Sequence, residues 1–333
     1  MSVIHFLNVQ NGDCNIIEHN SGRITIIDVC CARKEKNNDE YSMETFDIIM
    51  NSNSSGNYRQ KEYPENPIRY LKRIVKCSSI FRYIQTHPDM DHMDGIKDLF
   101  AEFDVLNFWD TKNNKKILSG DFNKYRKEDW DFYQSIRKST TDPKVLHLTD
   151  NSKGEFYCCD NGDGLCILAP SAELIKKAND SKDYNELSYV LLYQTGGKKI
   201  IFAGDSGEEI WNYIIKNYQS LVSNVDVLLA PHHGRKTGGN DFYLDILKPK
   251  LTLFGNAESK HLDYSSWNNR KLLKITNNQA GNIVLEIKDD EIKVFVSNEN
   301  FAKNFKNFKN LETIHGYYIG VVCKGDCKLW TNS

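Results

Sequence analysis

Long apolar stretches are missing from this sequence. No run approaches the roughly 18 apolar residues that a membrane-spanning helix requires. The N-terminus also lacks the charged region, apolar block and cleavage site of a secretory signal. We therefore expect a cytoplasmic protein that has no membrane partner. Nothing in the sequence identifies a protein partner.

Strong net charge is absent as well. The 43 Lys and Arg residues nearly balance the 45 Asp and Glu residues, which gives a net charge of −2. This balance argues against a protein that wraps nucleic acid by bulk electrostatics, but a local basic groove stays open. Candidates lie at 69–73, 112–116 and 301–309. In the last, three Phe residues have helical spacing, so an amphipathic helix packed on the core is the alternative.

Cysteine occurs in a pattern that does not suit structural disulfides. The nine cysteines are an odd number and are scattered along the chain, which is typical of reduced, mostly buried thiols. The sequence also has no Gly-x-Ser-x-Gly elbow, no Gly-x-x-x-x-Gly-Lys-Ser/Thr loop and no Gly-x-Gly-x-x-Gly fingerprint. Catalytic sets built on these motifs are therefore poorly supported.

Potential metal ligands are concentrated in residues 86–95. This segment reads Thr-His-Pro-Asp-Met-Asp-His-Met-Asp-Gly, and its candidate ligands are His87, Asp89, Asp91 and His92. Imidazole and carboxylate together suit Zn²⁺, Mn²⁺ or Fe rather than the all-oxygen sites of Ca²⁺. The segment therefore predicts a metal site. The alternative is a solvated acidic turn with two incidental histidines.

The residues around this segment favour the metal site. The apolar run 80–84 before it predicts a buried strand, and residues 95–100 after it look like the opening of a helix. Side chains on a turn between a strand and a helix can converge on one point, which an extended or helical run does not allow. We expect the ligands to converge there.

The spacing resembles the metal-binding signature of the metallo-β-lactamase superfamily, His-x-His-x-Asp-His, with Asp89 in place of the second His. With Pro after the first His, it looks like the nuclease-like domain of the ComEC DNA-uptake proteins. Other segments resemble that group in collinear order over residues 3–300. They read Phe-Leu-Asn-Val-Gln-Asn-Gly-Asp-Cys at 6–14, a strand ending in Asp at 24–28, Asn-Glu-Leu-Ser-Tyr-Val at 185–190, Phe-Ala-Gly-Asp at 202–205 and Leu-Ala-Pro-His-His-Gly at 229–234.

This resemblance implies a site for one or two divalent ions, with Zn²⁺ or Mn²⁺ as the first candidates and Mg²⁺ as the third. His87 and Asp89 would hold one ion. Asp205 would bridge both, and Asp89 as a hard oxygen ligand tilts the preference toward Mn²⁺ or Mg²⁺. An exposed loop histidine is the alternative for one ligand, His261. The full expected ligand set is His87, Asp89, Asp91, His92, Asp205, His233 and His261.

The catalytic residues follow from the same resemblance. Asp91 would orient a metal-activated water. One of His232 and His233 would be a metal ligand, and the other would protonate the leaving group or contact phosphate. Three more residues match positions around the site. Asp13 and Asp28 would orient loops and ligands from behind the metal, and Asn185 stands where many relatives carry a further His ligand.

Strand signals come in two sets, and helices lie at their margins. The first set is 3–9, 16–18, 23–28 and 80–86; the second is 164–169, 187–194, 198–203, 225–230 and 251–254, followed by 282–287 and 292–296. Helices are expected at 67–76, 95–103, 124–137, 171–178, 208–217, 241–247 and 266–276. The pattern indicates an α/β fold, and the resemblance narrows it to a four-layered αββα metallo-β-lactamase sandwich.

We expect a hydrolase domain over residues 1–300, with a polar insertion at 33–66, and a C-terminal helix and hairpin appendage over 301–333. The resemblance implies a metal-dependent phosphodiesterase or nuclease that acts on nucleic acid or a nucleotide. A small-ester or lactone hydrolase is a variant of this hypothesis. A catalytically weak binding or regulatory protein on the same fold is the alternative, because Asp89, Asn185 and the surroundings of His261 depart from the family pattern.

Overall fold

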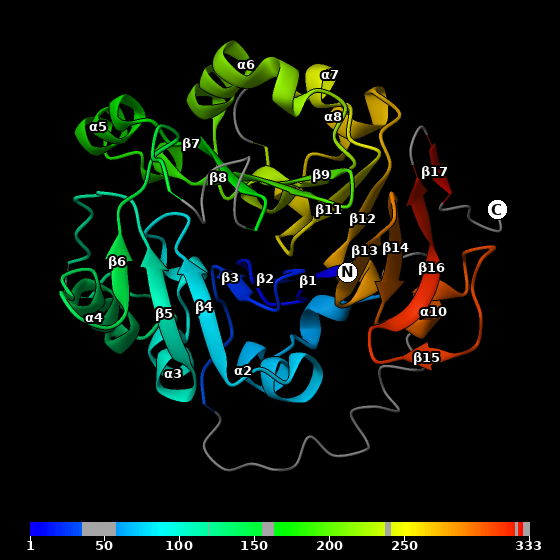
Figure 1. Ribbon diagram of the computed structural model, residues 1–333, viewed down its shortest axis with the longest axis horizontal. Helices are drawn as coiled ribbons and strands as arrows, with labels where there is room; N and C mark the ends of the chain where they lie inside the picture. The colour runs from blue at the N-terminus through cyan, green and yellow to red at the C-terminus, as the bar shows by residue number, and fades with distance from the viewer. Residues whose placement is uncertain (35–57, 119, 155–162, 237–240, 324–325, 329–333) are drawn as a thin grey trace.

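The computed structural model describes residues 1–34, 58–118, 120–154, 163–236, 241–323 and 326–328, and these form two β-sheets (Figure 1). The larger sheet has the order β15-β16-β14-β13-β1-β2-β3-β4-β5-β6, with β17 paired to β16. Its strands are β1 (Ser2–Phe6), β2 (Asn15–Glu18), β3 (Ile24–Ile27), β4 (Ser79–Ile84), β5 (Asp104–Trp109), β6 (Lys144–Leu146), β13 (Ile283–Lys288), β14 (Glu291–Val296), β15 (Glu312–Thr313), β16 (Gly316–Cys323) and β17 (Asp326–Lys328).

The smaller sheet has six strands in the order β12-β11-β10-β9-β8-β7. Its inner strands β9, β10 and β11 run parallel, whereas β7 and β8 are antiparallel to their neighbours. The strands are β7 (Leu165–Ala169), β8 (Val190–Thr195), β9 (Lys198–Phe202), β10 (Val227–Leu229), β11 (Leu251–Phe254) and β12 (Lys274–Thr276).

Both sheets bury apolar side chains on both faces. Along β9, Ile200 and Phe202 join the core between the two sheets, whereas Ile201 lies in the core beneath the helices. In the larger sheet, Ile27 faces the shared core and Ile26 faces the opposite side. This alternation follows from the two-residue repeat of a β-strand, and it fixes which face each sheet presents to the other.

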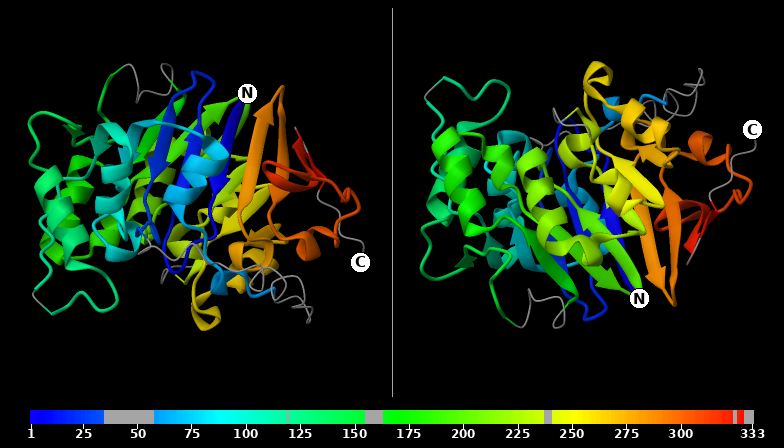
Figure 2. Two further views of the ribbon diagram at one scale, coloured as in Figure 1. Left: turned by 90° about the horizontal axis from the view of Figure 1, so that it is seen from below. Right: turned by 90° about the horizontal axis from the view of Figure 1, so that it is seen from above.

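Helices cover the two outer faces (Figure 2). α2 (Pro67–Tyr70), α3 (Ile96–Glu102) and α4 (Lys127–Ile136) pack on the larger sheet through side chains such as Leu99 and Tyr133. Trp211 of α6 and Trp267 of α8 pack on the smaller sheet. The helices on this side are α5 (Ala172–Ser181), α6 (Glu208–Val222), α7 (Leu244–Leu247) and α8 (Tyr264–Asn269). The architecture is therefore the αββα sandwich expected from the sequence.

The strands expected at 282–287 and 292–296 are present as β13 and β14, and the sheet they join was not predicted: β13 pairs with β1 in the larger sheet. Periodicity identifies a strand and does not identify its partner. The helix expected at 266–276 ends early because Lys271 takes a left-handed conformation, with φ 56°, and Lys274–Thr276 then forms β12.

The C-terminal segment joins the larger sheet through β16, which pairs with β14. Phe301 of α10 (Glu299–Ala302) and Phe305 are buried in the shared core. The alternative of packing on the core is thus confirmed for these two residues, but the helix expected over 301–309 is not formed, because α10 ends at Ala302 and turns follow. Most of the polar insertion expected at 33–66 lies outside the described residues, which resume at Tyr58.

None of the helices in the described segments has the length and apolar character needed to cross a bilayer.

The cysteines differ in their bonding. Cys166 on β7 takes part in a disulfide bond, so the expectation of reduced thiols was wrong at this residue. Cys14, Cys30, Cys31 and Cys77 are free thiols.

Candidate metal centre

The acidic and histidine side chains expected at the site lie where strands of both sheets end. β3 and β4 run parallel, as do β9 and β10, and parallel strands bring their carboxyl ends to one edge. Asp28 directly follows β3, and a short turn, Pro231–Gly234, begins two residues after β10. After β4 the chain enters a 3₁₀ turn over Met90–His92. The topology thus gathers segments that are distant in the sequence.

Gly204 allows the two sheets to approach at this edge. Its φ is 51°, and a Cβ there would lie 3.2 Å from the Cβ of Thr86. Beside it, the Tyr189 amide donates to the Thr86 carbonyl oxygen across the sheets at 3.0 Å, and the His232 amide donates to the Gly204 carbonyl oxygen at 2.9 Å. Only glycine fits this position without strain, and the next residue, Asp205, is thereby directed between the sheets.

Asp205 lies at the centre of the site, and its two oxygens face different histidines. Oδ1 lies 3.2 Å from His92 Nε2 and 3.7 Å from His233 Nε2. Oδ2 lies 3.5 Å from His232 Nε2 and 3.8 Å from His87 Nε2. A carboxylate with one pair of imidazoles at each oxygen has the arrangement of a bridging ligand between two metal positions.

The opposite ring nitrogen of each inner histidine is already held by an oxygen. His92 Nδ1 lies 2.8 Å from Asp28 Oδ2, and His233 Nδ1 lies 3.0 Å from Asp13 Oδ1. His87 Nδ1 lies 3.0 Å from the Thr86 hydroxyl. Such contacts fix ring orientation and direct Nε2 toward a metal. Asp13 and Asp28 therefore lie where the sequence interpretation placed them, behind the histidines.

The Nε2 atoms of His87, His92 and His233 and the Oδ1 atom of Asp205 are buried and have no hydrogen-bond partner among the described residues. Even the closest pair, at 3.2 Å, is not aligned as a hydrogen bond. An unpartnered buried polar atom costs about 1–3 kcal/mol, so four such atoms that face one another fit a divalent cation. We call these four residues the metal centre.

The charges in the metal centre depend on one another. Burial disfavours the imidazolium of His92, but the carboxylates of Asp205 and Asp28 outweigh burial and raise the pKa of His92 well above its usual value. Asp205 and Asp13 raise the pKa of His233 in the same way. Burial dominates at His87 and lowers its pKa. A cation that binds here therefore has to displace protons from His92 and His233.

Three groups of three ligand atoms in and around the metal centre lie within 4.8 Å of one another. They are His87, His92 and Asp205; Asp91, His92 and His233; and Asp13, Asp205 and His233. Each group contains His92 or His233, and Asp205 belongs to two of them. The residues present therefore fit one ion, or two ions that share Asp205 between them.

The two aspartates of the motif lie at the rim of the site. The side chain of Asp91 is 24% exposed, and its Oδ2 lies 4.0 Å from His233 Nε2. Asp89 is one-third exposed; its Oδ2 lies 4.0 Å from His87 Nε2, while its Oδ1 pairs with Lys115 Nζ at 2.5 Å. Asp89, the carboxylate in place of the family's usual histidine, thus lies between His87 of the metal centre and Lys115.

The structure does not bring His261 to the metal centre. Its side chain is 51% exposed and lies 3.8 Å from the carboxylate of Glu258. It lines a separate pocket of about 410 Å³, into which His232 also opens. Asn185 is half-buried in the turn Tyr184–Leu187. Among the described residues, no contact joins its side chain to a residue of the metal centre.

Sequence reasoning missed three contributors. In the sequence Lys115 is part of the basic run 112–116, and the positions of residues along the chain do not predict its contact with Asp89. Gln85 holds the motif turn, because its side-chain amide donates to the carbonyl oxygens of His87 and His92 at 2.8 and 3.0 Å. Arg235 lies beside His232, with Nη1 3.5 Å from its Nε2. Its position after the two-His turn is the one signal that could have revealed it.

Comparisons with known proteins give a likeness of fold only. No family model and no curated protein matches the sequence. Among solved structures, CmlA, a diiron β-hydroxylase from Streptomyces venezuelae, aligns with a TM-score of 0.45 at 11% identity, over 86% of this chain and 54% of that chain. The chain thus spans about half the length of that protein.

Two further structures align over more of their own length. A diphosphatase from the PhnP family gives a TM-score of 0.42 at 12% identity, over 86% of this chain and 99% of that chain. Metallo-β-lactamase SMB-1, bound to 2-mercaptoethanesulfonate, gives 0.34 at 11% identity, over 73% and 82%. These values are low, so the site has to be interpreted from its own geometry.

Proposed function

We propose that this protein is a metal-dependent hydrolase of the metallo-β-lactamase type that cleaves phosphodiesters in nucleic acid or a nucleotide. One observation carries the proposal: three buried Nε2 atoms and a carboxylate oxygen face one another without a hydrogen-bond partner in the described parts of the chain, while the opposite nitrogens are fixed by oxygens. A satisfied polar core would not leave these atoms free.

The metal centre would hold the ion, and Asp91 would complete the second position beside His233. The donors are imidazole nitrogens and carboxylate oxygens, which suit Zn²⁺ and Mn²⁺, with Mg²⁺ as a third candidate. When bound, such an ion supplies Lewis acidity, which lowers the pKa of a water molecule toward neutrality. The carboxylate of Asp91 at the rim is placed to orient that water.

The two histidines after β10 have different surroundings, which separates their proposed roles. His233 is buried and held by Asp13, so it suits a ligand. The side chain of His232 is 26% exposed and opens into the 410 Å³ pocket, so it suits the proton donor to the leaving group. Both residues have positive φ, 51° and 58°, which places adjacent imidazoles on one turn.

The pocket beside His232 favours an anionic substrate. Among the described residues, Arg235, Lys236, Lys260, His261 and one acidic residue, Asp263, line it. Lys260 pairs with the carboxylate of Glu258 at 2.6 Å, so the excess positive charge comes from Arg235 and Lys236. Arg235 Nε is buried and has no hydrogen-bond partner in the part of the chain that the structure describes. A phosphate oxygen supplies the acceptors that such cations bind. This excess of positive charge next to the metal centre supports a phosphodiester over a neutral ester or lactone.

The proposal can be tested with the protein loaded with Mn²⁺ or Zn²⁺. We expect hydrolysis of a nitrophenyl phosphodiester, and of an oligonucleotide or cyclic nucleotide. His232→Ala should keep its metal and lose roughly 10²–10⁴-fold in rate on the natural phosphodiester. The loss should be much smaller with the nitrophenyl leaving group, which needs no proton. His261→Ala, in the same pocket, is the control: any loss should be equal on the two substrates, because His261 is not proposed to donate the proton.

Two outcomes would contradict this proposal. Equal losses on both substrates together with metal loss would make His232 a ligand instead. A protein that binds metal stoichiometrically but hydrolyses none of these phosphodiesters would favour the binding or regulatory alternative, and hydrolysis of a lactone or carboxylic ester alone would favour the small-ester alternative.

A further inference from the structure

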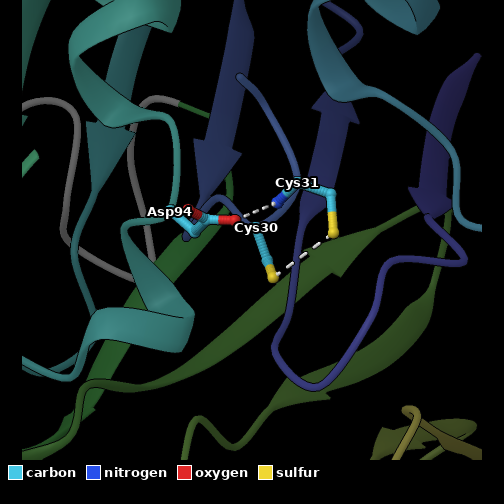
Figure 3. Close-up of side chains that lie close together, drawn as sticks. All are labelled: Cys30, Cys31 and Asp94. Carbon is cyan, nitrogen blue, oxygen red and sulfur yellow. Dashed lines mark hydrogen bonds between the residues drawn. The ribbon is translucent and has the colours of Figure 1, made fainter. Parts of the chain in front are cut away.

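A second cluster begins two residues after Asp28, the acceptor that holds His92, where β3 gives way to the next loop (Figure 3). The Sγ atoms of Cys30 and Cys31 are 3.7 Å apart, and the Cys31 amide donates to Asp94 Oδ2 at 3.3 Å. Cys30 is buried, whereas Cys31 is half-buried and lines a pocket of about 290 Å³. We call Cys30, Cys31 and Asp94 the thiol cluster.

The thiol cluster is not arranged for a metal. The Asp94 carboxylate is already bound by the Cys31 amide and by Arg33, whose Nε donates to Oδ1 at 2.7 Å. Cys30 Sγ contacts the Asn11 carbonyl oxygen at 3.7 Å, as well as Cys31. A metal would have to break these contacts. The observations therefore favour chemistry between the two sulfur atoms.

The two thiols also contact the loop that supports the metal centre. Cys30 Sγ donates to the Asn11 carbonyl oxygen, and the Gln10 amide donates to Cys31 Sγ at 3.4 Å. The same loop carries Asp13, which holds His233. The packing is close: a Cβ on Gly12 would lie 2.9 Å from Cys30 Sγ and 2.1 Å from the Asp91 carbonyl oxygen.

We propose that Cys30 and Cys31 form a reversible disulfide when hydrogen peroxide oxidises them, and that this bond weakens metal binding. A disulfide removes the S–H donor to Asn11 and moves both sulfur atoms out of their contacts with the loop. The loop that carries Asp13 then keeps its contacts with Asn256 but loses those with the two thiols, and His233 loses part of its orientation. This inference goes beyond the hydrolase proposal and does not depend on which ester is cleaved.

The reaction balances between two thiols and one peroxide. The Cys31 thiolate attacks one peroxide oxygen; an S–O bond forms, the O–O bond breaks, and hydroxide leaves. Cys30 then attacks Cys31 Sγ; the S–S bond forms, the S–O bond breaks, and a second hydroxide leaves. The two thiol protons convert both hydroxides to water. The thiols lose two electrons and the peroxide gains them.

The environment assigns the first step to Cys31. The contact between the two sulfur atoms lowers the pKa of the Cys31 thiol, and the same contact together with burial raises the pKa of the Cys30 thiol. Reactive cysteines are low-pKa and accessible. Neighbouring residues have Cα atoms about 3.8 Å apart, closer than the ~4.4–6.8 Å of ordinary disulfides, so the bond would be strained and readily reduced.

Mass spectrometry tests the bond directly. Trypsin cleaves after Arg23 and Arg33, so one peptide, 24–33, carries Cys30 and Cys31 as its only cysteines. After peroxide treatment this peptide should be lighter by two hydrogen atoms, and a dithiol reductant should restore its mass. Addition of oxygen atoms without this loss, or no change at peroxide levels that oxidise Cys77, would overturn the proposal.

The affinity for Zn²⁺ tests the second part of the proposal, that the disulfide weakens metal binding. The oxidised protein should bind Zn²⁺ about tenfold more weakly than the reduced protein, the scale for loss of an orienting contact. Cys31→Ser and Cys30→Ser should bind Zn²⁺ equally before and after peroxide. Cys77→Ser, which removes a free half-buried thiol elsewhere, should respond like the wild type. A disulfide that forms without changing Zn²⁺ affinity would overturn the regulatory part.

Discussion

The metal centre and the thiol cluster each combine an aspartate with other side chains that commonly bind metals, and they differ in how their atoms are used. Each places three potential ligand atoms within 4.8 Å of one another. In the metal centre the inward-facing atoms are buried and have no hydrogen-bond partner among the described residues, whereas in the thiol cluster the carboxylate and both sulfur atoms already have hydrogen-bond partners. Ligand type and spacing are therefore not enough to identify a metal site, and unpartnered atoms distinguish the two.

The largest expected effect separates the two clusters. Asp205→Asn or His92→Ala removes a ligand from the centre and should weaken Zn²⁺ or Mn²⁺ binding by more than roughly 100-fold, beyond the range for orienting groups. Asp94→Asn, in the thiol cluster, should change it by less than about twofold. Titration of the metal-free proteins measures this, with circular dichroism to confirm folding. Similar losses of metal affinity from substitutions in the two clusters would contradict the distinction between them.

The next effect comes from the carboxylates behind the histidines. Asp28→Asn and Asp13→Asn should each weaken metal binding about 10- to 100-fold, because His92 and His233 lose the acceptor that fixes their rings. Asp110→Asn is a matched control: Asp110 is equally buried but pairs with Arg137, so its loss should lower the melting temperature and spare the metal. If Asp28→Asn binds metal normally, orientation by this carboxylate is refuted.

The pH dependence of metal affinity is a third measure. Asp205 and Asp28 raise the pKa of His92 against the effect of burial, so the proton on Nε2 competes with the metal at neutral pH. Affinity should fall as pH falls and rise as pH rises, by up to about tenfold per unit for one displaced proton. The rise should continue above pH ~6.5, the ordinary pKa of histidine. Calorimetric titration at several pH values should show proton release; affinity independent of pH would contradict this.

The smallest effect concerns the rim. Lys115 shares Asp89 with the centre, so Lys115→Met should free that carboxylate and strengthen metal binding by about fivefold or less, since a partly exposed ion pair contributes about 1 kcal/mol or less. His261→Ala should leave affinity unchanged. Weaker binding in Lys115→Met would show instead that the lysine positions Asp89 as a ligand.

Much of the fold could be predicted because its inner strands are apolar and short. Ile24–Ile27 is buried throughout, and such runs are recognised without tertiary information. β5 could not be predicted from an apolar run, because Asn107 divides its apolar residues into two pairs, Val105–Leu106 and Phe108–Trp109. The pairing of β13 with β1 could not be predicted, because strand partners depend on contacts between residues far apart in the sequence.

The site residues likewise fall into those that local sequence predicts and those that it does not. The ligands His87, Asp91 and His92 lie within one turn, so local spacing was enough to propose them. The link from Asp13 to His233 joins residues 220 positions apart, and only the family resemblance pointed to it. Resemblance also suggested His261, which the structure places outside the centre. Hydrogen-bond satisfaction, which decides between the two clusters, is a property of the folded chain alone.

X-ray absorption of the Zn²⁺-loaded protein tests the central claim most directly, because it reports the atoms bound to the ion. The account predicts nitrogen and oxygen ligands at about 2.0–2.2 Å, with scattering from several imidazole rings and no sulfur. Asp205→Asn should lose this signal. A sulfur shell at about 2.3 Å would place the ion in the thiol cluster and contradict the assignment of the metal centre.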